Sequence, residues 1–584
     1  MKTVKYYLRV SIAAFVAAIA CPSCNDTWDD HYDVNGEFAN GKTGASLWEN
    51  LQTDSELAPF NRVLEACGYA EILNSPQMYT VWAPVITDAE ADKWIETYNK
   101  DKAAGRTGEQ NAAIKEFVMN HISLSNYQLN SQSSGKIKMR SGKYMTVSPS
   151  SVNDNVSISD VRMPSRNGMI YKIEKDVPYF RNVWEAVQAD TLDADGPYAL
   201  DSVANFLLQY EEEFLDLNAS VPGDIDSDGN QHYVDSVVYR RNTFFGDKSP
   251  LNGYERKAYI DSEDSVYYFL APTNKVWEEK VEDYKKYFIC AHDAVAPARL
   301  TAYRDSLKNL YARTALIESC FFNVRRQKDP TMKDSITSTI WDGAYMTDYD
   351  GAYSFIKPFE DGGILNGLSP EECSNGLLYK TDDWRILPEK TFIRTIKVEA
   401  ENTQYHQDFD EKKYVRTRES QNNDEYKVSG GSYIVVSDIN PGLNYTPSIT
   451  FNIPNTLSNC PYDIKIVFAT RKAETEEATD ILNREVSVGL NYYRNESNAW
   501  LTKPDNFGNK KFIVDGTKMD TICVTEGRAA FIPRVCNFAF ETEQRVRLTV
   551  SAKISKNNKK YSPNLAIDCI IFEPRLTTEG KEGE

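Results

Sequence analysis

Residues 221–235 read VPGDIDSDGNQHYVD and carry acidic side chains at the spacing of a calcium-binding loop. Aspartates alternate before a glycine, and a further aspartate takes the twelfth position of the loop. These candidate ligands are Asp224, Asp226, Asp228 and Asp235. Hard oxygen ligands at alternate positions around a glycine turn are suited to Ca²⁺, although such loops usually end in a bidentate Glu. The flanks do not resemble a helix pair, so the alternative is an acidic hairpin closed by a tight Asp-Gly turn.

The sequence contains one other motif associated with catalysis, but it lacks the structural context that the motif requires. Further catalytic motifs do not occur in the sequence. Residues 36–43, GEFANGKT, match the phosphate-binding pattern GxxxxGK[ST], but that loop must follow a buried strand and the preceding residues offer none. The chain has five His, without an HExxH or HxH pairing, and it has no GxSxG elbow. Pairs of carboxylates are too abundant to identify a glycosidase without geometry. We therefore expect a protein that is not an enzyme.

The N-terminus has the composition of an export signal. Three basic residues precede an apolar core at residues 10–20, which is too short for a stable membrane span. The following CPSCNDTWDDHYD resembles a Gram-negative lipoprotein signal, in which a Cys is acylated and becomes the mature N-terminus. Cys24 is the candidate acceptor and Cys21 the alternative, so 1–23 is the signal peptide and 24–45 a polar tether. The acidic residues after it resemble the export signals of surface-exposed lipoproteins, which implies an outer-membrane, lipid-anchored protein facing the cell exterior.

Charge and cysteine content narrow the classes of partner. A net charge of −19 repels phosphate backbones, so nucleic acid is not an expected partner. Beyond the signal, no run reaches the ~18 apolar residues of a membrane helix, so the membrane is reached through the lipid anchor alone. Of the ten Cys, we expect Cys21 to be removed with the cleaved signal peptide and Cys24 to be acylated. Export permits disulfides among the others, but their spacing selects no pairing, and buried free thiols are equally compatible.

Three pairs of matching stretches indicate that one unit is used twice. They are LWENLQTD (47–54) with VWEAVQAD (183–190), Trp82-Ala83-Pro84 with Leu270-Ala271-Pro272, and NGMIYKIEKD (167–176) with NGLLYKTDDW (375–384). The offset between the copies grows from 136 to 188 and then to 208, so the second copy carries insertions. We assign the copies to residues 46–180 and 181–392.

Each copy is predicted to be an α+β domain. In the first, Leu57–Leu64 has helical spacing before the helix stop Gly68, and YTVWAP is a strand ended by Pro. Residues 112–122 are predicted to form a second amphipathic helix, and 136–173 to alternate in short strands that close with MIYKI.

This order of elements resembles the fasciclin (FAS1) domain, which has a strand motif like YTVFAPTN, a Tyr-His pair and a closing NGxIYxID-like strand. YTVWAP, Asn120-His121 and NGMIYKIEKD stand in those places in the first copy, and YYFLAPTNKVW, Ser319-Cys320 and NGLLYKTDDW in the second. Asn120 replaces the expected Tyr, and Cys320 stands where the His is expected. We interpret His121 as a helix-end residue that is hydrogen-bonded into the core.

Residues 393–575 change character, because six short strands follow one another with turns between them. They are 432–439, 448–453, 463–470, 484–492, 545–554 and 566–574. This pattern predicts a β-sandwich of the jelly-roll type, followed by a polar tail at 576–584. The opening KVEAEN (397–402) and the closing NLAIDCIIFEP (564–574) resemble the galactose-binding-like sandwiches of carbohydrate-binding modules. In that family, carboxylates of the first and last strands hold a structural Ca²⁺, which implies Glu399, Glu401 and Asp568 as ligands, with Cys569 replacing the usual aromatic.

We predict a multidomain protein with two fasciclin-like α+β domains and a C-terminal β-sandwich. These resemblances imply a binding protein. Sugars stack on exposed aromatic rings while polar groups align their hydroxyls, and the loop 491–500 offers Tyr492, Tyr493 and Trp500. The alternative for these rings is a place in the core, which we expect for at least one of them.

We expect a surface lipoprotein that captures extracellular glycan beside an outer-membrane glycan-import system. The resemblance implies a TonB-dependent transporter and its lipoprotein as partners. An adhesin or scaffold that binds another protein is the first alternative. A glycoside hydrolase with an unrecognised site is the second.

Overall fold

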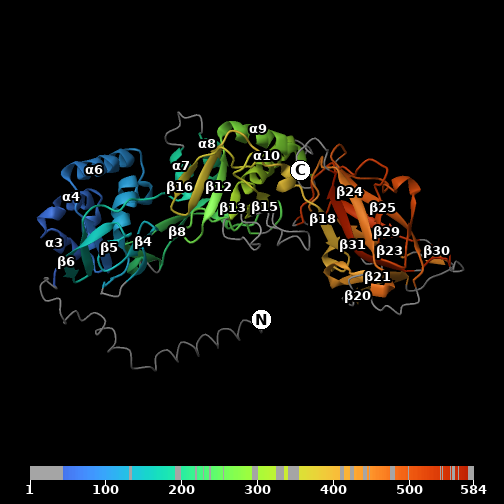
Figure 1. The fold of residues 1–584 in the computed structure, drawn as a ribbon, viewed down its shortest axis with the longest axis horizontal. Helices are drawn as coiled ribbons and strands as arrows, with labels where there is room; N and C mark the ends of the chain where they lie inside the picture. Colours follow the sequence, from blue (N-terminus) through green and yellow to red (C-terminus); the bar gives the residue numbers. More distant parts are fainter. Residues whose placement is uncertain are drawn as a thin grey trace, which may run out of the picture. The chain divides into compact units, whose positions relative to one another are not determined.

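The computed structural model describes residues 44–575 apart from short stretches. These are 130–133, 191–198, 218–219, 226, 228, 236–237, 254, 292–299, 324–334, 340–353, 408–412, 421–425, 439–443, 446, 474–480, 498, 540, 542, 553, 556–559 and 563. The signal, Cys21, Cys24, the tether to residue 43 and the tail 576–584 lie outside the described residues. The chain forms two compact units: the described residues up to Phe180 with Glu213–Tyr239, and Arg181–Glu212 with the residues from Arg240 onward. Both units combine helices with β-sheets (Figure 1).

The first copy is an α+β domain built on a seven-stranded sheet of order β2-β1-β7-β6-β5-β4-β3. Its strands are β1 (Tyr79–Pro84), β2 (Ile122–Ser123), β3 (Gly135–Lys138), β4 (Tyr144–Val147), β5 (Ser151–Val152), β6 (Val156–Ser165) and β7 (Gly168–Ile173). Its helices include α3 (Leu47–Leu51), α4 (Ala58–Ala66), α5 (Tyr69–Asn74) and α6 (Asp88–Ala103). Every residue of β1 and β7 is buried, as expected of a parallel pair covered on both faces.

The second copy repeats this core within a six-stranded sheet of order β15-β14-β13-β12-β17-β16. The strands are β12 (Tyr267–Pro272), β13 (Phe321–Asn323), β14 (Ser335–Ser338), β15 (Ser354–Ile356), β16 (Pro370–Cys373) and β17 (Gly376–Thr381). The helices include α7 (Val183–Asp190), α8 (Asp201–Leu208), α9 (Asn274–Tyr284) and α10 (Leu300–Glu318). β12 and β17 are parallel and begin their pairing at Tyr267 and Gly376, just as β1 and β7 begin theirs at Tyr79 and Gly168.

The Asn-Gly pair that opens both closing strands has the same contacts in each copy. Asn167 donates from Nδ2 to the carbonyls of Leu73 (2.9 Å) and Ser75 (2.7 Å). Gly168 has φ +147°, and a Cβ there would lie 1.8 Å from the carbonyl oxygen of Tyr79. In the second copy Asn375 donates to the carbonyls of Ile260 and Ser262, and Gly376 has φ +151° with the carbonyl of Tyr267 at 1.9 Å from such a Cβ. Only glycine fits either position.

A lysine on the closing strand of each copy forms an ion pair with an aspartate, and these two residues are also shared by the copies. The ammonium of Lys172, on β7, lies 2.8 Å from a carboxylate oxygen of Asp54. Lys380, on β17, lies 2.6 Å from a carboxylate oxygen of Asp190. Each pair ties the closing strand of its copy to the chain at the end of the opening helix. The matches at offsets of 136 and 208 therefore mark the same ion pair twice.

The helices of the first copy lie where the sequence predicts them, but one of them is not an α-helix. α4 covers the predicted helix, and Gly68 has φ +81°, as a helix stop requires. The helix predicted at 112–122 is a π-helix at Ala113–Val118 followed by a 3₁₀ turn at Met119–His121. Apolar spacing alone does not distinguish α from π geometry, because both present one apolar face.

The C-terminal residues form two antiparallel sheets whose inner faces share one core. One sheet runs β20-β21-β31-β24-β28 with β18 beside β31, and the other runs β19-β23-β29-β25-β26 with β27 beside β25. The bounds are β18 (Ile396–Glu399), β19 (His406–Gln407), β20 (Lys413–Glu419), β21 (Ser432–Asp438), β23 (Ser448–Asn452), β24 (Tyr462–Phe468), β25 (Arg484–Arg494), β26 (Ala499–Trp500), β27 (Lys511–Val514), β28 (Asp520–Cys523), β29 (Val546–Ser551) and β31 (Leu565–Pro574). All six strands predicted from the sequence are present, and buried and solvent-facing side chains alternate along β24 and β29.

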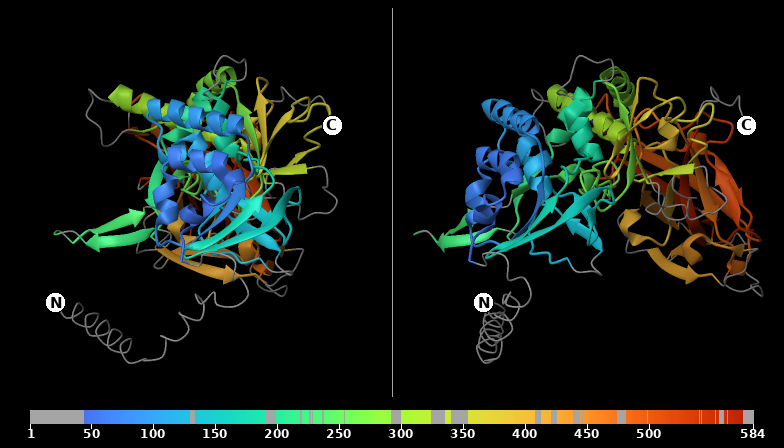
Figure 2. Two further views of the ribbon diagram at one scale, coloured as in Figure 1. Left: turned by 90° about the vertical axis from the view of Figure 1, so that its left-hand side faces the viewer. Right: turned by 60° about the vertical axis from the view of Figure 1, so that its left-hand side comes forward.

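Two further pairs of strands lie in the first insertion. β8 (Glu211–Leu215) pairs with β11 (Val238–Asn242), and β9 (Val221–Ile225) pairs with β10 (Gln231–Asp235) as a hairpin that projects outwards (Figure 2). Within the part of the chain that the structure describes, no helix has the length and apolar character needed to cross a membrane.

Candidate functional site

The first and last strands of the sandwich lie side by side and carry the predicted carboxylates. β18 is antiparallel to β31, with Glu399 opposite Cys569. The ladder between β31 and β24 skips Asp568, because its two neighbours pair with consecutive residues of β24. Asp568 is thus the extra residue of a β-bulge, which redirects its side chain. Oxygens of Glu399 and Asp568 and the sulfur of Cys569 all lie within 4.8 Å of one another.

A short turn holds these carboxylates in place. The backbone N–H of Ser429 donates to Asp568 Oδ1 at 3.0 Å, and its hydroxyl donates to Glu399 Oε1 at 2.6 Å. The ammonium of Lys397 lies 2.9 Å from the same Glu399 oxygen and also bonds Ser429. Gly430 follows at φ +59°, and a Cβ there would come within 3.0 Å of Glu401 Oε1. The glycine therefore lets the turn approach the acidic group closely.

Two oxygens of this group have no protein partner among the described residues. They are Oε2 of Glu399 and Oε2 of Glu401, both shielded from solvent. Burial raises the pKa of Asp568 to about 7, and the neighbouring Glu399 and Glu401 carboxylates add to that rise against the lowering by the Ser429 N–H and Lys397. Burial also raises the pKa of Glu401. These two carboxyl groups therefore bind protons more readily than exposed ones, and when all three are ionised their charge exceeds that of the Lys397 ammonium.

The residues present fit a hard divalent cation. Carboxylate oxygens of Glu399 and Asp568 lie within 4.8 Å of each other, the Glu401 carboxylate interacts electrostatically with both, and two buried oxygens lack donors among the described residues, which is an arrangement that Ca²⁺ satisfies in proteins. Lys397 already neutralises one oxygen of Glu399, so the unbonded oxygens are the available ligand atoms. Cys569 is a soft donor that calcium does not use.

The three aromatic residues proposed for glycan binding differ in accessibility. Tyr492 faces the inner side, where its ring lies 5.1 Å from that of Phe531 in the core cluster. Tyr493 is only 5% exposed and meets the edge of Trp500 at 6.0 Å. Trp500 is partly exposed. At least one ring faces the core, as expected; Trp500 and Tyr492 are both partly exposed, and of these two Tyr492 packs against the core cluster.

A polar row crosses the outer face of the second sheet beside Trp500. Arg547 on β29 lies opposite Asn452 on β23 and opposite Asn491 on β25. Directly opposite residues of antiparallel strands share a face of the sheet. The guanidinium carbon of Arg547 lies 4.2 Å from the centre of the Trp500 ring, a cation–π contact that couples the row to the aromatic.

The flanking amides are arranged to accept hydrogen bonds. In the part of the chain that the structure describes, Oδ1 of Asn452 and Oδ1 of Asn491 have no donor, and both atoms are shielded from solvent. The guanidinium has an amide on each side, and the hydroxyls of a ligand reach the two amide oxygens only when neighbouring side chains move. The sequence analysis named Trp500 as a candidate and did not name Asn452, Asn491 or Arg547. Alternation marks their strands, but the register between strands far apart in the chain is not visible in a single sequence.

His121 is a structural residue, as interpreted from the sequence. Its Nδ1 bonds the carbonyl of Phe117 at 2.7 Å, and its Nε2 accepts from the N–H of Val177 at 2.9 Å. Asn120 donates to the carbonyl of Val177 at 3.1 Å, so the pair anchors the chain where it leaves the last strand. In the second copy the Cys320 thiol donates to the carbonyl of Leu316 at 3.2 Å and is fully buried.

The acidic loop of the insertion is a β-hairpin rather than a helix–loop–helix. Asp235 pairs with Val221 across the ladder, and Gly229 has φ +86° in the turn region. Since Asp224 lies three residues further along the strand, the two backbones are about 10 Å apart. This geometry favours the acidic hairpin. Asp226 and Asp228 lie outside the described residues, so calcium binding here stays a prediction.

No protein-family model and no curated protein matches the chain. Solved structures match distantly. The CBM22-1–GH10 modules of a Clostridium thermocellum endo-1,4-β-D-xylanase, complexed with xylohexaose, align at 10% identity and a TM-score of 0.20 over 31% of this chain. The chain spans only 28% of that protein's length. A FAS1 domain pair from the insect cell adhesion molecule fasciclin I aligns at 10% identity and a TM-score of 0.17, over 57% of this chain and 98% of its own.

A mannan-recognising carbohydrate-binding module, TmCBM27, aligns at 10% identity and a TM-score of 0.16, over 32% of this chain and all of its own. The chain is thus a multidomain α+β protein with distant structural similarity to a FAS1 pair and to carbohydrate-binding-module β-sandwiches.

Proposed function

We propose that this protein is a non-enzymatic surface lipoprotein that binds extracellular glycan through the outer face of its C-terminal sandwich. The observation that carries the proposal is the row Asn452–Arg547–Asn491 beside Trp500, because it combines a partly exposed aromatic, a guanidinium 4.2 Å from the centre of its ring and two amides on the same face of the sheet. A sugar places its apolar face on the ring and its hydroxyls along the row. The ring of Tyr493 packs edge-on against that of Trp500, with the ring centres 6.0 Å apart.

The proposed fold family of the sandwich is galactose-binding-like, with a structural Ca²⁺ held by Glu399, Glu401 and Asp568. The ion would supply positive charge to the buried carboxylates and fasten the first strand to the last. The proposed cellular setting is the outer membrane, with Cys24 acylated and a TonB-dependent transporter with its lipoprotein as partners. A Cys24→Ala variant that still fractionates with the outer membrane would assign the acyl chain to Cys21.

A glycan array with the purified full chain tests the binding. Trp500→Ala and Arg547→Ala should each weaken glycan binding about tenfold or more, because each removes one side of the stacked pair. Arg494→Ala is the matched control, since this arginine is exposed at the end of the same strand β25. Equal losses in all three variants would argue against the row.

The duplicated α+β domain favours one competing function, an adhesin or scaffold for another protein, because two similar surfaces permit bivalent contact. If the protein bound no glycan on the array but still bound a cell-surface protein, the adhesin or scaffold function would be supported. Release of product from polysaccharides would instead support the hydrolase.

A further inference from the structure

The segment after α9 is hydrogen-bonded into two loops of the sandwich. The N–H of Ser458 donates to the carbonyl of Tyr287 at 3.0 Å, and the N–H of Ile289 donates to Ser458 Oγ at 2.8 Å. On the other side, the N–H of Cys536 donates to the carbonyl of Ile289 at 2.7 Å. Three hydrogen bonds therefore fix the register between this segment of the second copy and the sandwich.

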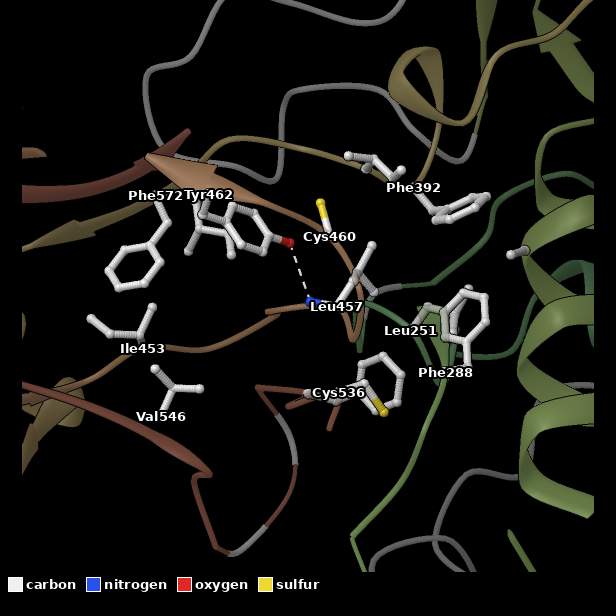
Figure 3. Close-up of a cluster of buried hydrophobic side chains, with 14 of the residues drawn as sticks. Leu251, Phe288, Phe392, Ile453, Leu457, Cys460, Tyr462, Cys536, Val546 and Phe572 are labelled. Atoms are coloured by element: carbon white, nitrogen blue, oxygen red, sulfur yellow. Dashed lines mark hydrogen bonds between the residues drawn. The ribbon is translucent and has the colours of Figure 1, made fainter. Parts of the chain in front are cut away.

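Apolar side chains close around these bonds. Phe288 is fully buried, with its ring 5.5 Å from that of Phe392 and 6.5 Å from that of Phe538. Figure 3 shows Phe288 and Phe392 together with Leu457 and Cys536 of the sandwich loops. The cluster belongs to one continuous core that includes both the second copy and the sandwich. The junction is packed like a domain interior.

Two cysteines meet within this junction. Cys290 and Cys536 are 4% and 1% exposed, and their sulfur atoms lie 3.6 Å apart. Disulfide bonds need sulfur atoms about 2.05 Å apart and suitably directed Cβ atoms. A movement of roughly 1.5 Å between two side chains whose backbones are already in register meets the distance.

We propose that Cys290 and Cys536 form a disulfide that fastens the second fasciclin-like domain to the sandwich. The oxidant is a disulfide-bearing protein or low-molecular-weight disulfide of the exported compartment. One cysteine thiolate attacks the oxidant's disulfide and releases one of its sulfurs as a thiol. The second cysteine then attacks the protein-bound sulfur of the mixed disulfide and releases the oxidant's other sulfur as a thiol, so the chain loses two protons and two electrons and the oxidant's disulfide becomes two thiol groups.

The bond must form before the junction closes. The neighbouring Cys290 sulfur and burial raise the pKa of the Cys536 thiol, and the thiolate is the attacking species. Oxidation therefore accompanies folding in the envelope. The link joins residues 246 positions apart and holds the polar row of the sandwich in a fixed orientation to the second domain.

Peptide mapping of the full chain, purified after export, tests the proposal. The protein is unfolded and alkylated without reductant, then cut with trypsin. We expect peptides 287–299 and 535–545, each with one cysteine, to appear as one linked species that reductant separates. Cys67, Cys320 and Cys460 should be alkylated in the same sample.

Two variants test whether the link joins Cys290 to Cys536 specifically. Cys536→Ser should leave Cys290 open to alkylation, whereas Cys460→Ser, at a buried cysteine of the same core cluster, should leave the linked pair unchanged. Alkylation of both Cys290 and Cys536 in the unreduced protein would overturn the proposal, as would a link from Cys290 to another cysteine. The wild-type map decides the question even if a variant fails to fold.

Discussion

Glu399, Glu401 and Asp568 are three acidic side chains near the bulge of β31, with Lys397 as the nearby ammonium. Two unit charges ~4 Å apart at an effective dielectric near 20 repel by about 4 kcal/mol, so the group is costly without a counter-ion. Millimolar Ca²⁺ should therefore raise the melting temperature of the full chain, because the ion binds only the folded state. Asp568→Asn should remove most of that rise while keeping an acceptor for the Ser429 N–H. Differential scanning calorimetry measures both effects.

The hairpin provides the control for this experiment. Asp224→Asn removes a charge of the same kind at an exposed position and should leave the calcium-dependent rise intact if the sandwich holds the ion. Identical melting curves in Ca²⁺ and in EDTA would remove the ion from the proposed fold. A rise lost in Asp224→Asn and kept in Asp568→Asn would place it in the hairpin.

His121 should make the first domain acid-sensitive. Burial lowers its pKa to about 4, against about 6.5 for an exposed histidine, and outweighs the Phe117 carbonyl and the Asp176 carboxylate, which raise it. The unfolded chain therefore binds more protons than the folded one between these values. Stability should be fully present above pH 6.5 and fall by about 3 kcal/mol as the pH falls to about 4.

Urea denaturation at pH 4 to 7 measures this slope. His121→Gln should start less stable at pH 7 and lose most of the histidine's contribution to the slope. His232→Gln, at an exposed position, should keep it. A wild-type slope retained in His121→Gln would assign the acid sensitivity to carboxylates elsewhere.

At the scale of elements, the parallel strand pair depends on the glycine that opens β7. Gly168→Ala would place a methyl group 1.8 Å from the Tyr79 carbonyl oxygen, so the strands must separate. We expect a loss of 3 kcal/mol or more, roughly the range of severe core substitutions. Gly142→Ala is the matched control, because Gly142 has φ +86° with open space around its Cβ position. Its expected cost is about 1 kcal/mol. Equal losses in chemical denaturation would show that backbone strain, not the close approach, dominates.

The residues that match between the two copies show which parts of the fold could be predicted from the sequence. The Asn-Gly pair, the Lys172–Asp54 pair and their counterparts appear as matching letters at fixed offsets, so the duplication was visible before the structure. The six strands of the sandwich were visible as well, because alternation over short runs is a local signal. Local patterns thus predicted the elements and their repetition.

Features that depend on register between distant strands were not predictable. The bulge at Asp568 is a property of its pairing with β24, and the row through Arg547 depends on the alignment of three strands. The meeting of Cys290 with Cys536 requires two domains to pack. The carboxylates were named only because their motifs resemble a family, and Trp500 only because aromatic loops bind sugars.

One buried cluster of the described residues includes side chains from both the second copy and the sandwich, which the sequence analysis assigned as separate domains. The first copy has its own buried clusters around β1 and β7. The second copy and the sandwich share a single large cluster, and the ring of Phe288 lies at their junction. Cooperative unfolding follows buried contacts, so a shared core should unfold as one body.

We therefore expect calorimetry of the full chain to show two main transitions, one for each compact unit. Phe288→Ala should lower the transition of the larger unit by about 3–4 kcal/mol and broaden or split it, because the second copy and the sandwich lose their common ring. Phe60→Ala removes an equally buried ring from the first copy and should lower only the other transition. If Phe288→Ala left the larger transition sharp while shifting that of the first copy, the junction would not couple the two domains. Three separate transitions in the wild type, with the disulfide intact, would contradict the shared core directly.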